Sequence, residues 1–116
     1  MPKPVIEAAA ALAAGRTSAV ALVDAALARI ADPAGEGSRA FMMVHGDAAR
    51  ATAAAMDSLR KAGRAPSPYA GIPISVKDLY DEAGDTSRSG SIVLNVGSPA
   101  KADVPSVQRL RRAGIV

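Results

Sequence analysis

The segment 71–78, with the sequence GIPISVKD, constrains the fold of this chain more than any other stretch. Its apolar residues Ile72, Ile74 and Val76 alternate with other residues, and a period of two predicts a strand with one buried face. Lys77 lies on the opposite face. A lysine on a strand can point into solvent and protect a sheet edge, or it can be held neutral as a catalytic base. The pattern alone leaves both interpretations open.

The run 69–94, YAGIPISVKDLYDEAGDTSRSGSIVL, resembles the amidase signature family. That family carries a G-(I/V)-P-(I/V)-x-(V/I)-K-D core, a short glycine-containing loop and T-x-x-G-S. Here the loop 86–91 reads TSRSGS, with one more residue between Thr and Gly. The helix expected near 103–114 and the runs TSAVALVDAALARI and AFMMV are also similar to the family, so the resemblance covers nearly the whole chain. The GIPISVKD core is the specific part, because alanine-rich helices match many proteins.

The resemblance implies that Lys77 is the terminal base of a Ser-Ser-Lys triad. In the family the two serines lie downstream, in a segment of the G-G-S-S-G-G type, and these 116 residues contain no such segment. We therefore expect the N-terminal part of an amidase that hydrolyses carboxylic amides, inactive alone because both serines are absent. The implied partner of the complete protein is a small-molecule amide, and we expect no cofactor and no metal.

The resemblance also implies the fold class. We expect an α/β protein, namely a truncated N-terminal portion of the amidase signature fold, in which helices pack on a mixed sheet. The expected organisation is a fragment of one amidase domain over 1–116, with a helical region at about 5–62, a lysine-bearing strand and loop region at about 69–98, and a helix at about 104–113. The ending of helix, Gly114 and two apolar residues is typical of a βαβ unit whose second strand is missing.

Local signals predict the individual elements. Thr17 or Ser18 is expected to cap a helix that runs to about residue 31. Apolar residues recur on that helix at spacings of three and four, which predicts one packed stripe of Val20, Val23, Leu27 and Ile30. The other expected elements are a helix at 6–14, a strand at 40–44, a helix capped by Asp47 and running to residue 62, a strand at 72–77 and an apolar patch at 92–96. The small face expected on the helix after Asp47 consists of Ala48, Ala51, Ala55 and Leu59.

Several polar residues near Lys77 have simpler structural interpretations. Asp78 points away from Lys77 on a strand, so we expect it to hold the adjacent turn through backbone hydrogen bonds. Ser75 points the same way as Lys77 and could hydrogen-bond its ammonium, but no second activating group supports a nucleophile there. The loop serines Ser87, Ser89 and Ser91 are expected to shape turns. Gly90 is expected either to adopt a positive φ or to allow a close approach of backbone.

Other side chains are not expected to bind metals or phosphates. The acidic residues Asp81, Glu82 and Asp85 lack EF-hand spacing and predict a solvated loop. His45 follows an apolar run and is expected at a strand end. The chain has no cysteine and no phosphate-binding glycine motif, which excludes disulfides, thiolate metal sites and nucleotide cradles of those types. The basic residues of the last helix suit its C-terminal end, so no nucleic-acid partner is expected.

The remaining expectations concern location and association. No apolar run is long enough to span a membrane. Glu7 interrupts the alanine-rich opening, which favours a mature helix over a signal peptide and hence a cytoplasmic protein. Aromatic residues make up only 3% of the chain and alanine is abundant, so the core is expected to be thin. The alternative function is therefore a non-enzymatic module that self-associates or binds a partner through a sheet edge and its alanine faces.

Overall fold

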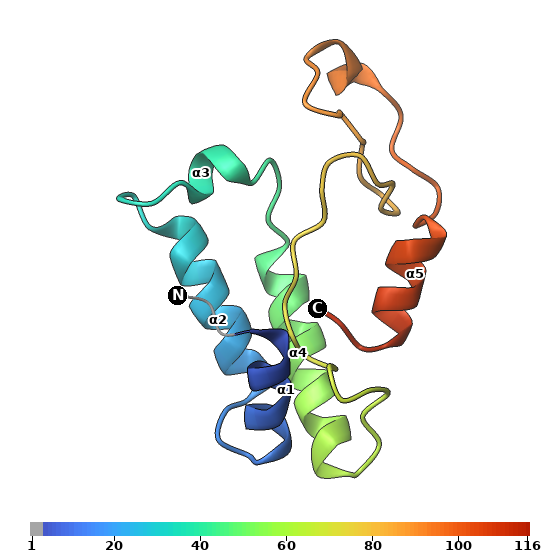
Figure 1. Ribbon diagram of the computed structural model, residues 1–116. Helices are drawn as coiled ribbons and strands as arrows, with labels where there is room; N and C mark the ends of the chain where they lie inside the picture. Colours follow the sequence, from blue (N-terminus) through green and yellow to red (C-terminus); the bar gives the residue numbers. More distant parts are fainter. Residues whose placement is uncertain (1–3) are drawn as a thin grey trace. The chain divides into compact units, whose positions relative to one another are not determined.

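The computed structural model describes residues 4–116, with every side chain except that of Asn95. The elements in chain order are α1 (Val5–Ala13), α2 (Ala19–Ala31), α3 (Gly37–Ala40), α4 (Gly46–Lys61), the 3-10 helix η1 (Val93–Val96) and α5 (Pro105–Arg112) (Figure 1). The chain divides into two compact units. The first unit contains the residues up to Ile74 together with Ala113–Val116, and the second contains Ser75–Arg112.

Helix α2 forms as its sequence predicts. The Ser18 hydroxyl accepts a hydrogen bond from the Ala21 N–H at 3.1 Å, which satisfies one of the free donors at the helix start. Val23 is buried, and Val20 and Leu27 pack beside it, so most of the predicted apolar stripe faces the core. Ala19, the first helical residue, is 0% exposed.

Helix α4 lies beside α2 (Figure 1), but it packs through a different face from the one predicted. Ala53 is fully buried, and Ala49 and Met56 pack against the same cluster. Three residues of the predicted face are exposed, namely Ala48, Ala51 and Ala55. The prediction was wrong because alanines occur on every side of this helix, so their spacing does not identify the packed face.

A second small cluster connects α1 to the start of the GIPISVKD segment. Leu12 is 2% exposed and packs with Ala8 and Ile72. These two clusters contain mainly alanine, valine and leucine, which agrees with the thin core expected from the composition.

No regular strand is present in residues 4–116, so the strands predicted at 40–44 and 72–77 are absent as such. The first of these stretches begins with the last residue of α3 and continues as irregular chain. The stretch 72–77 is extended, but in it only Ile72 is buried, and Ile74 is exposed. The reason is that this stretch pairs with a neighbouring segment over only a few residues. A β-strand forms only where a neighbouring strand pairs with it. An alternation of apolar and polar residues in the sequence does not show that such a neighbour exists.

The GIPISVKD segment nevertheless begins a parallel pairing within the first unit. Val116 donates its N–H to the Ile72 carbonyl at 3.0 Å, and its carbonyl accepts the N–H of Ile74 at 2.8 Å. Gly71 donates to the Gly114 carbonyl at 2.7 Å. In parallel strands, one residue forms hydrogen bonds with the two residues that flank the residue opposite to it. Val116 has this pattern, since it bonds to both Ile72 and Ile74.

The second unit is mostly irregular chain, closed by backbone hydrogen bonds. Gly84 donates to the Ala100 carbonyl at 2.9 Å, and Val104 donates to the Asp81 carbonyl at 3.0 Å. Helix α5 confirms the helix predicted at about 104–113, and its Val107 is buried. Asp103 accepts the Ala83 N–H at 2.8 Å and pairs with Arg111 at 2.7 Å.

The apolar patch expected at 92–96 is largely the single turn η1. Its side chains include some of the most exposed large apolar groups in the described part of the chain, with Ile92 at 85%, Val93 at 75% and Val96 at 92%. Among residues 4–116, no helix combines the length and the apolar character needed to cross a bilayer.

Candidate active site

Lys77 lies at the end of the extended segment, where the chain turns. Its carbonyl accepts the N–H groups of Leu79 at 2.6 Å and Tyr80 at 3.1 Å, which fixes the backbone immediately after the lysine. The side chain is exposed, and its amine makes no hydrogen bond or ion pair with any residue in 4–116. The structure therefore leaves the Lys77 amine available, although the extended segment is not part of a formed sheet.

Asp78 holds the neighbouring loop through its backbone, as the sequence predicts. Its Oδ1 accepts the N–H of Arg88 at 2.8 Å, and its Oδ2 accepts the N–H of Gly90 at 3.5 Å. The N–H of Arg88 is the main cause that lowers the pKa of Asp78 below its usual value. Partial desolvation opposes this change, and the N–H groups of Gly90 and Ser89 and the charge of Arg88 add to it.

The loop that faces Asp78 has an uncommon backbone conformation. Ser89 has φ of 51° and Gly90 has φ of 69°, so both lie in the left-handed region. Ser91 closes the turn by donating its N–H to the Arg88 carbonyl at 2.8 Å. Gly90 confirms the predicted positive φ. Ser89 was not expected there, because a residue with a Cβ pays a steric penalty for this conformation that glycine avoids.

The loop serines and acids have structural roles in this unit. The Ser87 hydroxyl donates to Asp81 at 2.6 Å, and the Ser91 hydroxyl accepts the N–H of Val93 at 3.2 Å. Glu82 pairs with Arg111 at 3.1 Å. No group of three or more metal-ligating side chains occurs among the described residues. His45 precedes the first residue of α4 instead of ending a strand, so that prediction was wrong.

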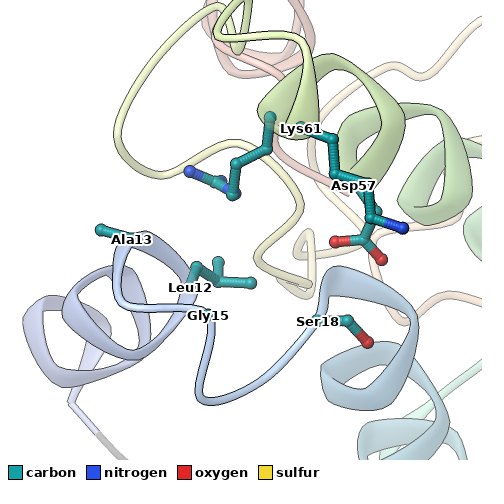
Figure 2. Close-up of a pocket in the computed structure, with 7 residues that line it drawn as sticks. Leu12, Ala13, Gly15, Ser18, Asp57 and Lys61 are labelled. Atoms are coloured by element: carbon teal, nitrogen blue, oxygen red, sulfur yellow. The ribbon is translucent and has the colours of Figure 1, made fainter.

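A hollow of about 280 Å³ lies in the first unit, between the α1–α2 turn and α4 (Figure 2). Two of its charged side chains, Asp57 and Arg60, already bind backbone groups of the protein. The carboxylate of Asp57 accepts the N–H groups of Ala19 at 2.7 Å and Val20 at 3.1 Å, and Arg60 donates to the Ala70 carbonyl at 2.5 Å. Lys77 is not among the lining residues. Sequence reasoning missed Asp57 and Arg60, because both lie within the uniform helical pattern of α4 and no local signal distinguishes them.

Comparisons with known proteins match the chain to one family. The pattern of the family described as Amidase matches residues 21–116. Over 105 residues the chain is 42% identical to a 1-carboxybiuret hydrolase subunit of Pseudomonas sp. (strain ADP), covering 90% of this chain and 23% of that protein. Over 109 residues it is 41% identical to a glutamyl-tRNA(Gln) amidotransferase subunit of Chloroflexus aurantiacus, and the match covers 92% of this chain and 22% of that protein.

Solved structures give the same result. A structure described as a vestigial protein complex bearing on the origins of an s-triazine catabolic enzyme superposes with a TM-score of 0.87 at 40% identity, over 98% of this chain and 25% of that one. The native peptide amidase of Stenotrophomonas maltophilia superposes with a TM-score of 0.85 at 34% identity, over 98% of this chain and 23% of that one. The chain thus spans about a quarter of the length of these relatives and has the fold of the N-terminal portion of amidases. On the family match and these superpositions, the chain belongs to the Amidase family.

Proposed function

We propose that this chain is the N-terminal part of an amidase and that Lys77 is the terminal proton acceptor of its Ser-Ser-Lys triad. The observation that best supports this role is that the GIPISVKD motif lies inside the matched stretch and presents a lysine without an internal partner.

The proposed reaction transfers an acyl group to a serine. The nucleophilic serine oxygen forms a bond to the amide carbonyl carbon, and its proton passes through the second serine to the neutral amine of Lys77. The ammonium then returns that proton to the departing nitrogen as the C–N bond breaks. Water repeats the sequence on the acyl-enzyme and releases the acid. Both serines would lie outside these 116 residues, so we expect the chain alone to release no amine or ammonia.

The test compares two lysine variants of the whole protein. Lys77→Ala removes the proposed proton acceptor, and Lys101→Ala is the matched control, since it removes another exposed lysine of the same unit. Release of ammonia is measured for a simple aliphatic amide, a peptide C-terminal amide and glutamine. We expect Lys77→Ala to lower kcat by about 10²–10⁴-fold, the usual contribution of general acid–base catalysis, and Lys101→Ala to leave it unchanged. Equal activity of the two variants would show that Lys77 is not the base.

A second candidate function is association with another protein. It is favoured by the exposed apolar side chains of Ile92, Val93 and Val96, and two of the relatives are named as subunits of larger enzymes. Exposed apolar groups gathered on one short segment often mark a contact surface. Sedimentation velocity tests this function: we expect wild-type protein to associate and the Ile92→Ser/Val96→Ser variant to associate less. A wild-type protein that stays monomeric at all concentrations would argue against self-association through this segment.

A further inference from the structure

We infer that Asp78 is a positioning residue that fixes Lys77 for proton transfer, by hydrogen-bonding the backbone beside the lysine to the loop 88–90. This inference rests on the function proposed above and concerns how the same site is held in place. Asp78 follows Lys77 directly in the chain, and its carboxylate reaches backbone donors ten and twelve residues further on.

The Lys77 side chain makes no hydrogen bond or ion pair of its own within residues 4–116. Its amine lies at the end of a flexible stem. The place of the amine therefore depends on the backbone. Within its own unit, the backbone that follows Lys77 is held by the turn at the Lys77 carbonyl and by the Asp78 carboxylate.

The conformation of the loop 88–90 depends on Asp78. The N–H groups of Arg88 and Gly90 donate to one carboxylate at 2.8 and 3.5 Å, and Ser89 between them adopts a left-handed φ of 51°. Such a conformation persists only where its surroundings enforce it. A carboxylate that accepts several backbone N–H groups supplies that enforcement, since charge-assisted hydrogen bonds are stronger than neutral ones. Loss of the carboxylate would release the loop and the backbone beside Lys77 together.

A direct charge interaction between the two side chains does not explain the arrangement. Asp78 and Lys77 form no ion pair in the described part of the chain, and the oxygens of Asp78 face the N–H groups of Arg88 and Gly90. Asp78 therefore acts on the lysine through the backbone. A shift of about 1 Å in a catalytic group can lower the rate about 100-fold, so such positioning has a measurable effect on turnover.

The experiment measures kcat and KM for Asp78 variants of the whole protein. Asp78→Asn keeps one oxygen to accept the Arg88 N–H and loses the other acceptor, whereas Asp78→Ala loses both. We expect kcat to fall about 10-fold for Asn and about 100-fold for Ala with KM unchanged, because the base moves while substrate contacts remain. Asp57→Ala is the matched control. It also removes a carboxylate that accepts two backbone N–H groups, but in the other unit, so its kcat should not change.

The outcomes separate this inference from the proposed function. If Lys77→Ala keeps full activity, the proposed function fails, whatever Asp78 does. If Lys77→Ala abolishes activity while both Asp78 variants keep kcat, the function stands and the inference is wrong. A rise in KM at constant kcat would also overturn it, since that result assigns Asp78 to substrate binding. Should Asp78→Ala not fold, the kcat of Asp78→Asn decides the question.

Discussion

Gly71, the first residue of the GIPISVKD motif, gives the sharpest stability prediction. Its φ is +87°, and a Cβ placed there would overlap the Cβ of Ala19. Ala19 cannot move aside easily, because it is 0% exposed and its N–H donates to Asp57 at 2.7 Å. The left-handed backbone costs a non-glycine residue about 1–2 kcal/mol, and overpacking a tight contact costs about 1–3 kcal/mol. We therefore expect Gly71→Ala to lower the free energy of unfolding by about 2–5 kcal/mol.

Gly63→Ala is the matched control for this prediction. Gly63 lies in the same unit with φ of +68°, and nothing lies within 4 Å of a Cβ placed there. The control therefore has the backbone penalty without the overlap, and both variants gain equally from a less flexible unfolded chain. Urea unfolding followed by far-UV circular dichroism suits a helical chain that has no tryptophan. A difference between the two variants of less than about 0.5 kcal/mol would refute the packing argument at Gly71.

Three further predictions follow from contacts of single residues. Ser18→Ala removes the cap that accepts the Ala21 N–H and should lower the free energy of unfolding by about 1 kcal/mol in the same urea assay, whereas Ser18→Asp should not. Leu12→Ala empties a fully buried site and should cost about 2–5 kcal/mol; a smaller loss would mean that the thin core closes over the cavity. Because folding lowers the pKa of Asp78, the stabilisation by its carboxylate is complete above the unfolded value of about 3.9 and is lost as pH falls through the lower folded value. The protection factors of the Arg88 and Gly90 amides, which compare exchange with the intrinsic rate at each pH, should therefore fall below about pH 4, and an equal fall in Asp78→Asn would contradict this assignment.

For helix α2, the sequence was sufficient to predict both where the helix begins and which face packs against the core. Its cap and its apolar stripe are both local signals, and the structure confirms the Ser18 cap and most of the stripe. Helix α4 shows the limit of that reasoning. The helix itself was predicted correctly, but its packed face was not. That face depends on which alanines contact α2, and the spacing of the alanines does not identify them.

The candidate site was predictable only in part. The resemblance identified Lys77, whose catalytic role stays a prediction, and turn chemistry indicated that Asp78 would bind backbone groups. The partners of Asp78 could not be predicted, because they belong to an irregular loop whose left-handed Ser89 has no sequence signature. The strand expected at 72–77 depended on pairing, and in the described residues that pairing extends only over 71–74.

The hydrogen bonds between Ile72, Ile74 and Val116 have a consequence for folding on the ribosome. The first unit needs Gly114–Val116, so it cannot be completed until the whole of the second unit has been synthesised. At about 5–20 residues per second this delay lasts a few seconds, during which the GIPISVKD backbone has no parallel partner. Nascent chains are thus exposed to wrong pairing in this interval, and chaperone binding should be strongest before Val116 emerges.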